Sequence, residues 1–203
     1  GRVPTAAENE AAEFVKVVLG STEDVWGGVM PQQTRRPYEP PKLVLFTEAV
    51  QSACGIAGAA VGPFYCPRDT KVYLDMHFFQ AIRAAAGPEA DFARAYAIAH
   101  EVGHHVQHLL GTLEKVHQLQ ARAPQTTANQ LSVRLELQAD CFAGVWGHHT
   151  AERGIINQQD VTTALQTAAQ IGDDYLQHRA RGTVAPETFT HGSGMTPSPR
   201  HVL

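Results

Sequence analysis

The residues best suited to chemistry are His100, Glu101 and His104, which form the pattern H-E-x-x-H in a segment of helical composition. On an α-helix, residues four apart are separated by about 40° around the axis and about 6 Å along it. The two imidazoles therefore share one helix face and suit two neighbouring ligands of a tetrahedral zinc ion. Glu101 stands beside them and can act on a water at the metal without being a ligand. The pattern predicts a zinc hydrolase site with Glu101 as general base.

The motif alone leaves a simpler interpretation open, because the chain has eleven histidines among 203 residues. His100 and His104 would then be surface histidines that share an exposed helix face by chance. A hydrolytic zinc ion usually takes three protein ligands and one water. A third ligand on another element would therefore decide between the two interpretations.

A second group of candidate residues lies in segment 134–141, RLELQADC. Glu136 is the natural third ligand, because it follows His104 by enough residues for a second helix to fold back on the first. Asp140 lies one turn later on the same face, where it can accept a hydrogen bond from a ligating histidine and fix its tautomer. The alternative is that Glu136 and Asp140 form a solvated acidic edge paired with Arg134.

Helical carboxylates and histidines also hold di-iron centres, which need Glu-x-x-His on two helices and a glutamate from each of two others. Glu101 and His104 fit that pattern once. Glu136 does not, because Ala139 stands three residues later, where a histidine is required. One zinc ion therefore explains more of the sequence than two irons do.

Several longer motifs resemble those of the bacterial neutral zinc metallopeptidase family. They are FARAY at 92–96, IAHEVGHHVQ at 98–107, ELQADCFAGVW at 136–146, GPFYCP at 62–67, VYLD at 72–75 and FTHG at 189–192. The resemblance implies a zincin-type peptidase that binds one zinc ion through His100, His104 and Glu136 and hydrolyses peptide or protein substrates. It also implies an extracytoplasmic domain of the bacterial cell envelope, often with a membrane anchor upstream.

Peptide hydrolysis also requires a group that stabilises the charge developing on the carbonyl oxygen. The candidates are His191, Tyr65, Tyr73 and Arg134. We take His191 as the catalytic candidate because it follows a loop and resembles a family motif, with a structural loop histidine as the alternative. Solvated or packing roles are expected for four other histidines: His105, His108, His148 and His149.

The periodicity of apolar residues predicts an α+β fold that is mostly α. Helices are expected at 5–19, 21–30, 76–86, 89–110, 112–123, 129–150 and 158–181, and strands at 42–46 and 71–75. The zincin-like fold implied by the resemblance packs a small antiparallel sheet on the helix with the H-E-x-x-H motif. By analogy with zincins, strand 71–75 is the candidate edge strand for an extended substrate, and a plain core strand is the alternative.

One metallopeptidase domain is expected over residues 1–193, because no linker or repeat divides the chain. Residues 194–203 follow it as a flexible tail, because residues 193–200 are rich in glycine and proline.

The cysteines favour one disulfide. Cys54 and Cys66 bracket a glycine-rich segment that is expected to be a loop, and pairing them would stabilise the fold by roughly 3 kcal/mol in an oxidising compartment. Two reduced, buried thiols are the alternative. Cys141 is expected to pack as a small apolar residue.

Composition excludes some partners. With 16 basic and 20 acidic residues and a formal charge of −4, the chain offers no basic stripe for nucleic acid. No apolar run approaches the roughly 20 residues needed to cross a bilayer. An anchor upstream of Gly1 is compatible with this, and the oligomeric state is not predicted. Two rival functions stay open: a zinc-binding scaffold or partner-binding module without catalysis, and a purely structural helical domain.

Overall fold

The computed structural model describes residues 5–58, 62–86 and 90–152. Its helices are α1 (Ala6–Thr34), α2 (Met76–Ala86), α3 (Ala90–Leu110), α4 (Thr112–Gln120) and α5 (Gln125–Glu152). Its strands are β1 (Lys42–Phe46), β2 (Ala49–Ser52), β3 (Gly55–Gly58), β4 (Phe64–Cys66) and β5 (Lys71–Asp75). The predicted α+β, mostly helical class is confirmed. The expected helix 158–181, His191 and the tail 194–203 lie outside the described residues, so the extent of the expected domain 1–193 stays a prediction.

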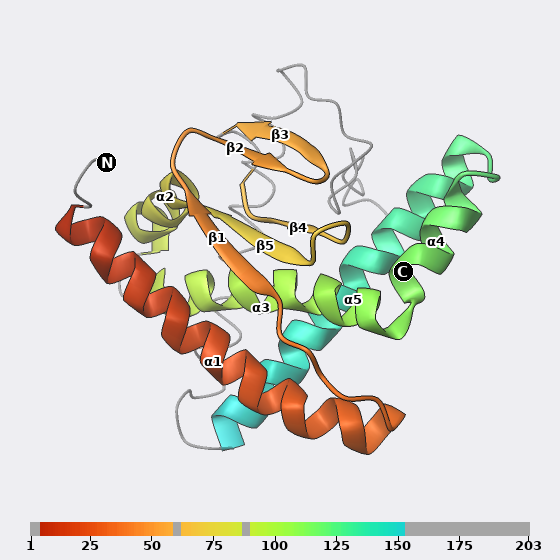
Figure 1. Ribbon diagram of the computed structural model, residues 1–203, viewed down its shortest axis with the longest axis horizontal. Helices are drawn as coiled ribbons and strands as arrows, with labels where there is room; N and C mark the ends of the chain where they lie inside the picture. The colour runs from red at the N-terminus through yellow and green to blue at the C-terminus, as the bar shows by residue number, and fades with distance from the viewer. Residues whose placement is uncertain (1–4, 59–61, 87–89, 153–203) are drawn as a thin grey trace, which may run out of the picture.

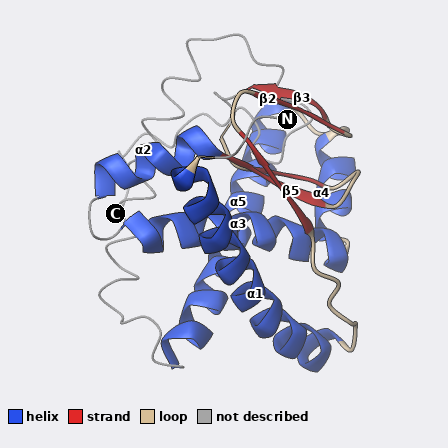
Figure 2. Ribbon diagram, turned by 60° about the vertical axis from the view of Figure 1, so that its left-hand side comes forward, coloured by secondary structure: helices blue, strands red, loops and turns tan. Residues whose placement is uncertain are grey.

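Helix α3 is the central element (Figure 1). It packs against all four other described helices and against β4 and β5. Its apolar residues, among them Tyr96, Ile98, Val102 and Val106, are buried in the main core. The strands lie on one side of α3 and α1 lies on the other, while α5 runs from beside α4 across α3 toward α1 (Figure 1, Figure 2). Helix α3 is therefore packed on several sides, so it holds its side chains in fixed positions.

The sheet that covers α3 has the strand order β1-β5-β4. Strand β5 runs parallel to β1 and antiparallel to β4, so this small sheet is mixed in direction. Because β5 is the middle strand, the expectation that residues 71–75 form an edge strand for substrate is wrong. The physical reason lies in its burial: Val72, Tyr73 and Leu74 are all buried, as in a strand covered on both faces.

The glycine-rich segment between the cysteines is not the loop that the sequence predicts. Strand β3 pairs antiparallel with β2, and β4 then joins the sheet beside β5. Glycine and alanine give no alternation of polarity, yet Ala57 is fully buried in this hairpin. The disulfide between Cys54 and Cys66 is present and ties the hairpin to β4. Cys141, in contrast to the prediction, is exposed on α5.

Helix α1 is one helix, although the sequence predicts a break at Gly20. Its buried face continues through that position, with Val15, Val18, Thr22 and Val25 at helical spacing. Trp146 of α5 also donates a hydrogen bond to the Ser21 hydroxyl at 3.0 Å. Packing against the core therefore outweighs the low helix propensity of one glycine.

The observed ends of α4 and α5 differ from the predicted ends by only a few residues. Helix α5 begins at Gln125, immediately after Pro124, and not at the expected residue 129, and α4 ends at Gln120. None of the described helices has the length and apolar character needed to cross a membrane.

Candidate metal centre

The candidate ligands meet where α3 crosses α5, and Gly103 lies at the crossing. A Cβ atom added to Gly103 would lie 2.9 Å from the carbonyl oxygen of Ala139 and 3.2 Å from its Cα. No side chain fits there, so the two backbones can approach closely only because this residue is glycine. Gly103 lies between the two motif histidines, and Ala139 lies between Glu136 and Asp140 on α5. The crossing therefore brings His100 and His104 of α3 opposite Glu136 and Asp140 of α5.

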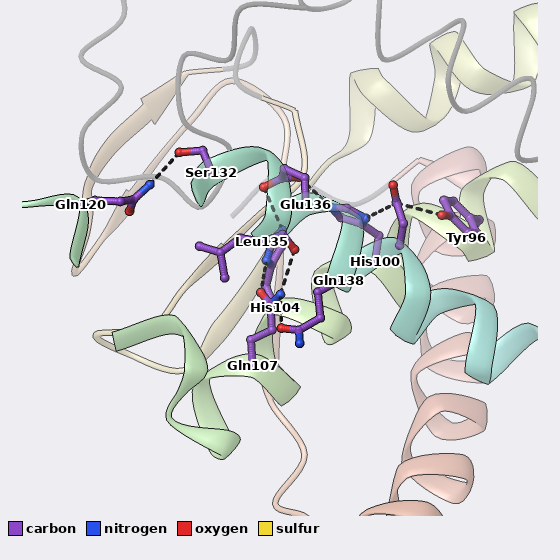
Figure 3. A network of polar contacts seen from close by, with 10 residues as sticks. Tyr96, His100, His104, Gln107, Gln120, Ser132, Leu135, Glu136 and Gln138 are labelled. Carbon is purple, nitrogen blue, oxygen red and sulfur yellow. Dashed lines mark hydrogen bonds and ion pairs between the residues drawn. The ribbon is translucent and has the colours of Figure 1, made fainter. Parts of the chain in front are cut away.

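Three predicted ligands converge at this crossing (Figure 3). His100 Nε2 lies 3.2 Å from one carboxylate oxygen of Glu136, and His104 Nε2 lies 3.4 Å from the other. The candidate ligand atoms of these residues all lie within 4.8 Å of one another. Among the described residues, no other cluster of three histidine, cysteine or acidic side chains has this geometry.

Asp140 lies behind His100 and orients it. The His100 Nδ1–H donates to Asp140 Oδ1 at 2.8 Å, and the Tyr96 hydroxyl donates to the same oxygen at 2.8 Å. Burial opposes charge on His100, but the hydrogen bonds to Asp140 and Glu136 and the charge of Glu101 raise its pKa to about 9. Burial acts to raise the pKa of Asp140, but its hydrogen bonds from His100 and Tyr96 hold it below the usual range. The site is thus built to stabilise positive charge.

His104 is held from behind as well, by a residue of its own helix. Its Nδ1–H donates to the side-chain oxygen of Gln107 at 2.8 Å. Both His104 and Gln107 are 0% exposed. Each histidine therefore has Nδ1 engaged by a protein acceptor and Nε2 directed to Glu136.

Glu101 is buried beside this cluster, with 2% of its surface exposed. After the two acidic residues of α5 that bond His100, the charge of Glu101 also helps to raise the pKa of His100. It does not belong to the three-residue cluster itself. A carboxylate in this place can take up a proton next to a metal without competing for the ion.

The donor set fits zinc. Two imidazole nitrogens and one carboxylate oxygen form the protein ligands of many catalytic zinc sites, which keep a fourth position for water. The hydrogen bonds at both Nδ1 atoms resemble the outer contacts that orient ligating histidines. His100, His104 and Glu136 can hold such an ion with no other described side chain added to the cluster.

Several other predicted candidates make hydrogen bonds to residues outside the three-residue cluster. Tyr65 donates its hydroxyl to His105 Nδ1 at 2.9 Å, and Tyr73 donates to Asp69 at 2.6 Å, so both phenols make structural contacts. His105 also donates from Nε2 to the carbonyl of Glu39 at 2.6 Å, and burial lowers its pKa. Its predicted packing role is confirmed. Arg134 is exposed on α5.

Replacing Tyr65 by phenylalanine should lower the free energy of unfolding by about 1–3 kcal/mol, because it leaves the buried Nδ1 acceptor of His105 without its donor. Zinc affinity should stay within about twofold of the wild-type value, since the hydrogen bond that is lost joins Tyr65 to His105, which is not one of the three candidate ligands. Urea denaturation and chelator competition measure the two quantities. A large loss of zinc affinity without a loss of stability would contradict the structural role.

Three residues of the site were missed by the sequence-based prediction of its members: Gly103, Tyr96 and Gln107. Each carried a signal. Gly103 is a glycine in a helix interior, which usually has a packing reason. Tyr96 and Gln107 lie four residues before His100 and three after His104, spacings that place side chains on a common helix face.

Comparison with known proteins agrees with this geometry. A model of the family described as "Putative neutral zinc metallopeptidase" matches residues 2–197. The chain is 49% identical over 186 residues to the "Uncharacterized protein YpfJ" of Escherichia coli strain K12, a match that covers 92% of this chain and 64% of the relative. It is 40% identical over 199 residues to the "Uncharacterized protein Rv2575" of Mycobacterium tuberculosis, with 91% and 64% covered.

The chain thus spans just under two thirds of the length of these relatives. No solved structure matches it. The family match extends over nearly the whole chain and includes the two helices that carry the candidate ligands. The chain therefore belongs to the Putative neutral zinc metallopeptidase family.

Proposed function

We propose that this chain is the catalytic domain of a zinc-dependent peptidase that hydrolyses peptide bonds in peptide or protein substrates. The observation that carries the proposal is the convergence of His100, His104 and Glu136, with candidate ligand atoms within 4.8 Å of one another, beside the buried Glu101. A structural domain has no need of such a cluster. A zinc scaffold has no need of the extra carboxylate.

The residues of the site divide the work of hydrolysis. His100, His104 and Glu136 would hold the zinc ion, which would supply the Lewis acid that activates water and polarises the peptide carbonyl. Glu101 accepts the proton of the attacking water and returns it to the amine nitrogen as the C–N bond breaks. Asp140 keeps His100 in the tautomer that presents Nε2 to the ion. His191 stays our candidate for stabilising charge on the carbonyl oxygen.

The proposed place of action is outside the cytoplasm. The disulfide between Cys54 and Cys66 suits an oxidising compartment such as the bacterial cell envelope. The chain covers 64% of the length of the Escherichia coli relative, and a membrane anchor in the remainder of the whole protein is part of this proposal.

Metal removal tests the proposal. The protein purified without chelator should contain one zinc ion per chain by mass spectrometry of metals. Treatment with 1,10-phenanthroline should lower hydrolysis of fluorescein-labelled casein by roughly 100-fold or more, because the metal contributes several kcal/mol to catalysis. Added zinc should restore the rate.

Hydrolysis that survives complete zinc removal would contradict the proposal. One bound zinc without hydrolysis of casein or of a mixed peptide library would favour the scaffold function. No bound zinc, even after zinc is added, would favour the structural helical domain.

A further inference from the structure

The side chain of Gln107 links the metal centre to α5 from inside the core (Figure 3). It lies on α3 one turn after His104 and is 0% exposed. Its oxygen accepts from His104 Nδ1–H at 2.8 Å. Its nitrogen donates to the carbonyl oxygen of Leu135 at 2.8 Å and to the side-chain oxygen of Gln138 at 3.0 Å. A buried amide is thus fully hydrogen-bonded between a candidate ligand and the backbone of the opposite helix.

The orientation of this amide is dictated by chemistry. A backbone carbonyl can only accept, so the Gln107 group that faces Leu135 must be the NH2 group. The amide oxygen is then the atom that faces His104. Because that oxygen can only accept, His104 must carry its proton on Nδ1.

The remaining ring nitrogen, Nε2, therefore bears the lone pair. It lies 3.4 Å from the Glu136 carboxylate, on the side where the ligands converge. A neutral histidine without such a partner can exchange between its two tautomers, and only one of them presents Nε2 to an ion. His104 is fully buried, so no bulk water replaces Gln107 as an acceptor.

We propose that Gln107 is a positioning residue, which locks His104 in the Nδ1–H tautomer and so prepares it as a zinc ligand. The inference rests on the zinc site proposed above. Gln107 accepts the Nδ1 proton of His104 as Asp140 accepts that of His100. The same amide bonds the carbonyl of Leu135, the residue immediately before Glu136. Gln107 therefore ties two ligands on two helices to each other through one rigid group.

Zinc affinity of substituted proteins tests this role, because affinity does not depend on the unknown natural substrate. The affinity of Gln107→Leu, measured by competition with a chromogenic chelator at pH 7.5, should fall about 10- to 100-fold, the usual range for residues that orient metal ligands. Gln107→Glu keeps an acceptor for the Nδ1 proton but loses the two N–H donors to α5, so its zinc affinity should fall less than that of Gln107→Leu without reaching the wild-type value.

Gln120→Leu is the matched control. Gln120 of α4 also bridges to α5, donating to the Ala128 carbonyl at 3.0 Å and to the Ser132 hydroxyl at 2.7 Å, but it contacts no candidate ligand (Figure 3). This variant loses a comparable pair of hydrogen bonds between helices. Its zinc affinity should stay within about twofold of the wild-type value, which separates positioning of a ligand from general packing.

The proposal is overturned if folded Gln107→Leu binds zinc within twofold of the wild type, or if Gln107→Glu binds no better than Gln107→Leu. Wild-type protein that binds no zinc would overturn the proposed function as well, so the two failures are distinguishable. If Gln107→Leu does not fold, the tautomer of His104 can be measured instead in long-range 1H–15N NMR spectra of the metal-free wild type at pH 8. They should show the Nδ1–H tautomer for His104, and the Nε2–H tautomer would overturn the proposal.

Discussion

Replacing Glu101 by glutamine is expected to lower peptide hydrolysis by roughly 100- to 10,000-fold, the contribution typical of a general base, while one zinc ion per chain stays bound. Glutamine has the shape of glutamate and can fill the same buried space, but its amide cannot accept a proton from water. Glu101 lies outside the three-residue cluster, so the ligand set is left intact. Hydrolysis of labelled casein and metal content of the same samples give the two readouts.

Two further variants serve as comparisons for Glu101→Gln: one should keep the activity, and the other should lose the metal. Glu114→Gln removes a carboxylate that pairs with His108 and does not belong to the cluster, and it should leave the rate within about twofold of the wild type. Glu136→Ala should lose both hydrolysis and tight zinc binding, because it removes a ligand. An unaltered rate in Glu101→Gln would rule out Glu101 as the general base, whatever the metal content.

Replacing Gly103 by alanine is expected to damage both the fold and the metal site. Alanine would favour the helix by about 0.5–1 kcal/mol. Its Cβ would lie 2.9 Å from a backbone oxygen of Ala139, however, and neither helix backbone can turn aside as a flexible side chain would. Overpacking of this kind costs about 1–3 kcal/mol or more. Moving α5 away also moves Glu136 from the histidines, so zinc affinity should fall at least about tenfold.

Gly20→Ala gives the matched control for Gly103→Ala. Gly20 is also in a helix interior, but a Cβ atom there would meet no atom within 4 Å. This variant should raise the free energy of unfolding by up to about 1 kcal/mol and leave zinc affinity unchanged. Urea denaturation of the metal-free proteins and chelator competition measure both effects. Wild-type stability and affinity in Gly103→Ala would contradict the close crossing of α3 and α5.

The sequence predicts best those elements in which a regular apolar pattern ends at helix-breaking residues such as glycine and proline. Helix α3 was expected at 89–110 and is found at Ala90–Leu110, because a regular apolar stripe lies between Gly87-Pro88 and Gly111. The two strands at 42–46 and 71–75 are also confirmed: the first is a short apolar run, and Val72 and Tyr73 favour extended backbone in the second.

Elements that no regular local pattern marks could be predicted less well. The small residues of β3 carry no period, and the hairpin is defined by its pairing with β2 and by the disulfide. Gly20 suggested a helix end, but the buried face of α1 continues through it. The middle position of β5 depends on the parallel neighbour β1, which no local pattern reveals.

In the candidate site, too, some features could be predicted from the sequence and others depend on how the helices pack. Spacing in the motif was enough to group His100 with His104, and the need for a third ligand led to Glu136 and then to Asp140. Spacing could not give the distance between α3 and α5, which depends on Gly103 meeting Ala139. Nor could it show that a glutamine inside the core would take a hydrogen bond from His104.

The central claim is that α3 and α5 together hold one zinc ion, and anomalous X-ray diffraction at the zinc absorption edge tests it most directly. Crystals of the protein purified without chelator should give one strong anomalous peak between the Nε2 atoms of His100 and His104 and the carboxylate of Glu136. The peak should vanish after treatment with chelator. A zinc peak at another place in the chain, or no peak in zinc-loaded crystals, would contradict the account.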